Sequence, residues 1–165
     1  KKVRRRQRRR QQRRERETKK AMCDETLTTT GSPPHYVEAQ IVRAEALELE
    51  LLDHEDPSVV AANAVTQTLL YVMADRLGEA RFLWRRTAAA VASAPELQAA
   101  WAVVASLWER NDVPNGLRLL AETEWSPAVV ALASQTLDEV RRREADLLGL
   151  VYSAIPLADV AKALF

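Results

Sequence analysis

Between residues 36 and 152, apolar side chains recur at intervals of three and four residues, and this spacing limits the possible folds more than any other feature. In residues 36–53, for example, Val37, Ile41 and Ala44 fall on one stripe. Such a stripe indicates an amphipathic helix that buries one face. The sequence therefore predicts an all-α fold.

Pro, Asp and Asn divide this region into separate helices. Asp56-Pro57 and Ser126-Pro127 each place a capping side chain before a proline, which is tolerated at the first helical position. Because no short amphipathic helix buries its apolar face alone, we expect stacked antiparallel hairpins. The only strand candidate is the segment 153–155. The predicted helices cover residues 36–53, 57–75, 79–93, 95–110, 114–121, 127–152 and 156–165.

The charges are divided unequally along the chain. Residues 1–20 carry 13 of the 24 Lys and Arg but only 2 of the 23 Asp and Glu, so the remaining residues are net acidic. With Val3 as its one apolar side chain, the segment 1–20 cannot bury enough surface to offset its ordering entropy. We expect a disordered basic arm and linker over residues 1–34.

Residues suited to catalysis are few. The chain has two histidines, His35 and His54, and one cysteine, Cys23, which lies beside two acids that make its thiol less nucleophilic. It contains no metal-binding or phosphate-binding motif. We therefore expect no enzyme activity, no metal and no cofactor, and we interpret His54 as a structural or solvated residue. No apolar run approaches the length of a membrane span, and no signal peptide opens the chain, so an intracellular setting is expected.

Two further clusters have alternative interpretations. Trp84, Trp101 and Trp108 have helical spacing, which favours a place in the core, although an aromatic surface that anchors a partner is the alternative. The triplet 141–143 of three arginines spans about 200° of a helix, so most of it should face solvent while one arginine pairs with an acid on a neighbouring element.

Three segments resemble a known family. They are LLYVMADRLGEARFLWRR at 69–86, AAWAVVASLWERNDVPNGLRLL at 99–120, and the segment 124–165 that begins EWSPAVV and contains the arginine triplet. Together they resemble the small PCI-domain subunits shared by the proteasome lid, the COP9 signalosome and translation initiation factor three, with the signalosome member the nearest. The resemblance covers about residues 57–165.

The resemblance implies a helical repeat over residues 35–152, followed at 153–165 by the start of a winged-helix module. The rest of that module is missing from this sequence, so either a fragment or an incomplete chain is expected. It also implies a non-catalytic scaffold that supports cullin deneddylation by assembling with other PCI subunits. The residues expected to bind these partners are Arg141, Arg142, Arg143, Leu157, Val160 and Phe165.

The basic arm has no counterpart in the family pattern. Its density of arginine attracts phosphate polymers without sequence preference and also resembles nuclear import signals. A low-complexity extension without function is a third interpretation, and nucleic acid is expected to bind only through residues 1–20. The family implies a location in nucleus and cytoplasm, and no membrane partner. The arginines that would carry these roles are Arg4, Arg5, Arg6, Arg8, Arg9 and Arg10.

Overall fold

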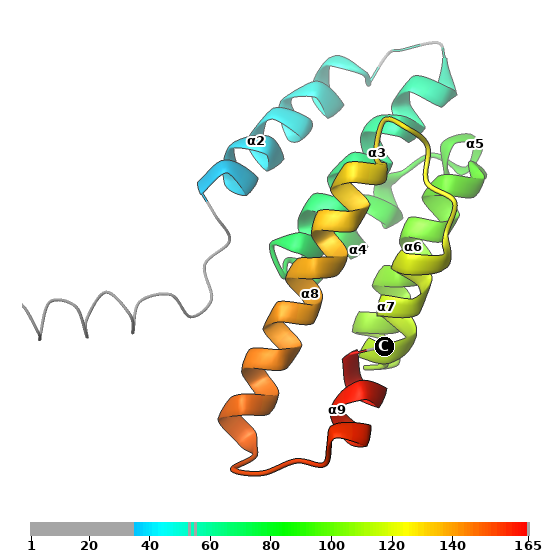
Figure 1. Cartoon of the computed structure of the whole chain (residues 1–165). Helices are drawn as coiled ribbons and strands as arrows, with labels where there is room; N and C mark the ends of the chain where they lie inside the picture. Colours follow the sequence, from blue (N-terminus) through cyan, green and yellow to red (C-terminus); the bar gives the residue numbers. More distant parts are fainter. Residues whose placement is uncertain (1–34, 53, 55, 165) are drawn as a thin grey trace, which may run out of the picture. The chain divides into compact units, whose positions relative to one another are not determined.

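The computed structural model describes residues 35–52, 54 and 56–164, and its regular secondary structure in this part is helical. The described part contains no strand, so the strand candidate at 153–155 was wrong, whereas the all-α prediction is confirmed. The helices, drawn in Figure 1, are α2 (His35–Glu50), α3 (Pro57–Met73), α4 (Leu77–Arg86), α5 (Ala89–Ala92), α6 (Pro95–Trp108), α7 (Val113–Glu122), α8 (Val130–Val151) and α9 (Leu157–Leu164).

Helix α3 is the centre of the described bundle. It contacts α2, α4, α5, α6 and α8. Its side chains Val65, Leu69, Leu70 and Val72 are almost completely buried. A helix that is apolar around most of its circumference is stable only when other helices surround it, and the arrangement in Figure 1 meets this requirement.

Helices α6 and α7 form the second hairpin of the stack, after α2 and α3 (Figure 1). The two helices approach closely at Gly116, where an added Cβ would lie 2.7 Å from Cδ2 of Leu107. The turn between them contains Asn111 in the left-handed region, with φ of 50°, a conformation that Asn tolerates better than most residues. The predicted break at Asn111-Asp112 and the expected stack of hairpins are both confirmed.

Two aspartates cap helices as their positions suggest. The Asp56 carboxylate accepts a hydrogen bond from the Ser58 amide at 2.8 Å, and Pro57 begins α3 as predicted. Asp112 accepts one from the Asn115 amide at 3.1 Å at the start of α7.

The prediction that Ser126 caps a helix beginning at Pro127 was wrong. Helix α8 begins at Val130, and residues 127–129 form a turn. The Ser126 amide instead donates to the Glu96 carboxylate at 2.7 Å, and the Ser126 carbonyl accepts from the amides of Val129 and Val130. The serine therefore ties the connecting segment to α6, a contact between residues 30 positions apart that no local pattern reveals.

The predicted helix over residues 79–93 is two helices, α4 and α5, separated at Thr87. Thr87 has extended backbone angles, and its hydroxyl donates to the Leu83 carbonyl at 2.8 Å. Thr123 ends α7 in the same way, with its hydroxyl 2.7 Å from the Leu119 carbonyl. In both cases the amide of the same threonine also donates to that carbonyl, so amide and hydroxyl share one acceptor at the helix end.

The tryptophans do not share one environment. Trp84 and Trp101 stack between α4 and α6 with ring centroids 4.9 Å apart and nearly parallel planes, so the core prediction holds for this pair. Trp108 is 47% exposed, and the Arg81 guanidinium lies over its ring at 5.9 Å. The core prediction was therefore wrong for Trp108.

Candidate partner-binding surface

Each of the three arginines in the middle of α8 contacts a different part of the fold. Arg143 reaches α3, where it donates to the Val72 carbonyl at 2.8 Å and lies 3.5 Å from the Asp75 carboxylate. Asp75 has a φ of 60° just beyond the end of α3. The expected pairing of one arginine with an acid on a neighbouring element is therefore confirmed, and it joins α8 to the end of α3.

The other two arginines contact α8 and α9. The Nε atom of Arg141 donates to the Leu164 carbonyl of α9 at 3.2 Å. Arg142 forms ion pairs along its own helix, at 2.7 Å to Glu139 and 2.6 Å to Asp146. The hydrogen bond from Arg142 is the main cause that lowers the pKa of Glu139. Only Arg142 thus has the solvated environment expected for most of the triplet, since Arg141 and Arg143 hold neighbouring segments.

A group of large apolar side chains is exposed at the C-terminal end of α8 and the start of α9. Leu150 is 77% exposed and Leu157 is 83% exposed. Helix α9 has no buried residue, although it contacts α7 and α8. Exposed apolar patches are often sites where other proteins bind, so this group is the candidate partner-binding surface. We call it the C-terminal apolar surface, and its members are Leu147, Leu150, Val151, Tyr152 and Leu157.

The sequence contained a signal for this surface. Leu147, Leu148, Leu150 and Val151 are four apolar residues within five positions, more than a single buried stripe of a helix can hold. In the structure Leu147, Leu150 and Val151 are exposed.

A hollow lies beside the C-terminal apolar surface, between the end of α8 and α9. Its volume is about 360 Å³. Val160, one of the residues expected to bind partners, lines it, and Leu157 belongs to the surface itself. Phe165 lies outside the described residues. The lining residues are Ala145, Leu148, Gly149, Tyr152, Ser153, Ala154, Ile155, Val160 and Leu164.

The other candidate residues are placed as follows. The Nδ1 atom of His54 accepts a hydrogen bond from the Asp56 amide at 3.2 Å, so His54 takes part in the connection that leads into α3. Cys23 and the arginines of residues 1–20 lie outside the described residues. In the part of the chain that the structure describes, no group of three His, Cys, Asp or Glu side chains is placed to hold a metal ion. None of the helices described is both long and apolar enough to cross a bilayer.

Stacked helical hairpins that end in an exposed apolar surface are typical of proteins that bind other proteins through helix faces. Comparison with known families agrees with this class. Residues 60–165 match the family model described as the CSN8/PSMD8/EIF3K family, and the chain belongs to that family.

Three curated relatives carry the name COP9 signalosome complex subunit 8. The chain is 31% identical to the protein of Danio rerio over 118 residues, which are 70% of this chain and 61% of the relative. It is 31% identical to the protein of Xenopus tropicalis and 29% identical to that of Xenopus laevis, each over 128 residues, or 76% of this chain and 64% of the relative. The chain thus spans somewhat less than two thirds of the length of these relatives. The expected resemblance to the small PCI-domain subunits is confirmed.

Proposed function

We propose that the chain is a non-catalytic scaffold subunit of a COP9 signalosome, which supports cullin deneddylation by assembling with other PCI subunits. The observation that carries this proposal is the C-terminal apolar surface, with Leu150 and Leu157 more than three quarters exposed. The similarity of the chain to COP9 signalosome complex subunit 8 of three vertebrates supports the choice of this complex.

The physical role of such a subunit is to bury apolar helix faces against its partners. Leucine and tyrosine side chains that water surrounds in the isolated chain gain free energy when a partner covers them, about 25 cal/mol for each Å² of apolar area. The helices that present them are held by Arg141 and Arg143, which join α8 to α9 and to α3. A surface fixed in this way loses little conformational entropy on binding.

Affinity purification of the tagged chain from its own organism, followed by mass spectrometry, tests the proposal. We expect signalosome subunits in stoichiometric amounts. Companions from the proteasome lid or from initiation factor three would assign the chain to an equivalent subunit of those complexes, which the family also includes. Recovery of a monomer that has no affinity for signalosome subunits would contradict the proposal.

A second candidate function, nucleic-acid binding, is favoured by the 13 Lys and Arg of residues 1–20. Counterion release would make this binding strongly salt-dependent and independent of base sequence. Titration of RNA and DNA with the chain and with a variant that lacks residues 1–20 tests it. Loss of binding in the shortened chain would show that residues 1–20 bind the nucleic acid. Absence of binding in both chains would contradict a nucleic-acid-binding function.

We also propose a location in nucleus and cytoplasm, with residues 1–20 acting as an import signal. Fusion of residues 1–20 to a fluorescent protein tests the import signal, because the proposal expects nuclear accumulation of the fusion. An even distribution would contradict it.

A further inference from the structure

Helix α2 carries a second apolar stripe that faces away from the bundle. Its buried side chains Val37, Ile41 and Ala44 form the stripe that packs on α3. Because each residue turns an α-helix by about 100°, the second stripe lies on the opposite side. Its larger members are exposed, Val42 by 63% and Leu49 by 70%. We call this stripe the outer face of α2, and its members are Ala39, Val42, Ala46 and Leu49.

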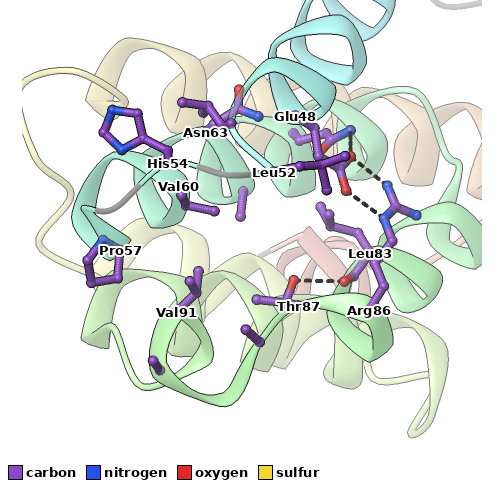
Figure 2. A pocket seen from close by; sticks show the side chains of 15 residues that line it. Glu48, Leu52, His54, Pro57, Val60, Asn63, Leu83, Arg86, Thr87 and Val91 are labelled. Carbon is purple, nitrogen blue, oxygen red and sulfur yellow. Dashed lines mark hydrogen bonds and ion pairs between the residues drawn. The ribbon is translucent and has the colours of Figure 1, made fainter.

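Polar contacts also hold α2 against the bundle. Arg86 of α4 pairs with Glu48 at 2.6 Å, and the Tyr71 hydroxyl of α3 donates to Glu45 at 2.7 Å. The pair of Glu48 and Arg86 lines a cavity of about 390 Å³ among α2, α3, α4 and α5, as Figure 2 shows. These contacts and the buried stripe fix the position of α2, so its outer face loses little conformational entropy when a partner binds.

The outer face lies at the end of the stack of hairpins, because α2 is the first of the described helices (Figure 1). The terminal units of such stacks need a polar outer face to stay soluble, and α2 presents an apolar one. Residues 1–34 are poorly suited to cover it, since Val3, Met22 and Leu27 are their only large apolar side chains. The outer face therefore suits a helix of another chain, which would continue the stack.

Two charged residues beside the outer face indicate the chemistry of that helix. Arg43 and Glu50 are exposed, and neither forms an ion pair with another described residue. They are seven positions apart, so they lie two turns apart along the same edge of the outer face. A partner helix that places an acid at the first position and a base at the second would pair with both.

A second copy of the chain does not fit this face. If the outer faces of two antiparallel α2 helices overlapped completely, Arg43 would lie against Arg43 of the second copy, and like charges at this spacing repel. A shift of one heptad would pair Arg43 with Glu50, but it would move Ala39 and Val42 beyond the end of the other α2 helix. Only a helix of different sequence can cover the whole face and pair with both charges.

We propose that the outer face of α2 binds an antiparallel amphipathic helix of another protein. This helix has large aliphatic side chains opposite Ala39 and Ala46, because small and large side chains fill an interface when they face each other. It carries an acid opposite Arg43 and a base opposite Glu50. The antiparallel direction continues the alternation of α2 and α3 in the stack.

This partner is distinct from the subunits that the C-terminal apolar surface binds, so the inference goes beyond the proposed function. The two surfaces lie on different helices, α2 in one case and α8 and α9 in the other. Helix α2 also precedes residues 60–165, the part that matches the family model. One chain can therefore bind both partners at the same time.

Two synthetic heptad peptides of about 28 residues, long enough to form a helix, test the proposal. Both have leucines to face the alanines of α2. One peptide carries Lys at the edge of its stripe and Glu seven positions later, so that antiparallel binding places them opposite Glu50 and Arg43. The other has these two charges exchanged. In fluorescence anisotropy with the 165-residue chain, we expect the first peptide to bind about three- to tenfold more tightly. Equal affinities, or no binding, would overturn the proposal.

A charge-reversed chain tests the assignment of the two charges. The variant that combines Arg43→Glu with Glu50→Arg should prefer the second peptide, by a similar factor. Both residues are exposed and have no ion pair to lose, so the variant should fold like the wild type. An unchanged preference would overturn the proposed pairing.

Apolar variants locate the bound peptide. Val42→Glu combined with Leu49→Glu should weaken the binding of both peptides at least about tenfold, because the charges would enter the interface. Leu150→Glu combined with Leu157→Glu, on the C-terminal apolar surface, is the matched control and should leave peptide binding unchanged. Loss of peptide binding in the control alone would overturn the assignment to α2. If the first variant fails to fold, the charge-reversed chain decides.

Sedimentation velocity of the free chain tests the alternative occupant, a second copy. We expect no dimer that depends on α2, and a dimer that Val42→Glu dissociates would overturn the assignment to another protein. The variant of Val42 and Leu49 should keep its affinity for signalosome subunits, so failure of this inference is distinguishable from failure of the proposed function.

Discussion

Arg143 shows how one side chain can hold two helices of this bundle. Its side chain is 23% exposed and bonds to the carbonyl of Val72, which lies in the last turn of α3. Arg142, the next residue, is 46% exposed and pairs only within its own helix. Arg143 therefore joins α8 to α3, whereas the adjacent Arg142 makes contacts only within α8.

We expect Arg143→Met to lower the free energy of unfolding by about 1–2 kcal/mol, because the Val72 carbonyl loses its charged donor. Arg142→Met is the control and should cost at most about 0.5 kcal/mol, as exposed ion pairs do. Urea unfolding followed by circular dichroism measures both values. Equal losses in the two variants would contradict the structural role of Arg143.

The ion pair of Glu48 and Arg86 predicts a dependence of stability on pH. The carboxylate accepts from Arg86 at 2.6 and 2.7 Å and from Gln67, and the hydrogen bond from Arg86 is the main cause that lowers the pKa of Glu48 below 4.5. Since the pKa is lower in the folded chain, the pair stabilises the fold above pH 4.5, and this contribution is lost as the pH falls through the folded pKa.

Arg86→Met should therefore lower the free energy of unfolding by less than about 1 kcal/mol at neutral pH, because the guanidinium is half exposed. The difference from the wild type should shrink as the pH falls to about 3. Urea unfolding at the two pH values measures it, with Arg85→Met as the control. A difference that stays constant with pH would show that Glu48 and Arg86 are not coupled.

At the scale of one helix, Gly149 weakens the exposed end of α8. It lies within the helix, and an added Cβ there would meet no atom within 4 Å. Gly149→Ala should raise the free energy of unfolding by about 0.5–1 kcal/mol, since alanine loses less backbone entropy. The same change at Gly78, in the first turn of α4, should have a smaller effect. Thermal unfolding measures both, and destabilisation by Gly149→Ala would indicate a contact of this position that the structure lacks.

Prediction of the helices from the sequence succeeded where the signal was local. The Asp56 carboxylate caps α3 as predicted, and the chain breaks at Asn111-Asp112 as predicted. The prediction failed where a distant contact determines the start of a helix. At Ser126, for example, the amide donates to the Glu96 carboxylate of α6. It also failed at Thr87, because the apolar spacing continues through the break, where the backbone of Thr87 is extended.

At the scale of the whole molecule, the fold class and the family could be predicted, but the surface could be predicted only in part. Leu157 and Val160 lie at the C-terminal apolar surface and its hollow, and their binding of partners, which the family resemblance implied, stays a prediction. The exposure of Leu147 and Val151 could not be predicted, because a periodic pattern does not tell whether a second helix covers the apolar stripe. The cavity among α2, α3, α4 and α5 had no sequence signal, since its lining comes from four separate helices and from two of the connections between them.

The most direct test of the account is the affinity of the chain for the other signalosome subunits of its own organism, measured by isothermal titration calorimetry. The account predicts binding that weakens at least about tenfold when Leu150→Glu and Leu157→Glu are combined, because both charges would enter the interface. Val42→Glu, at an exposed position on α2, should bind like the wild type, and all three chains should keep their helical circular dichroism. Wild-type affinity in the double variant, or no binding by the wild-type chain, would contradict the account.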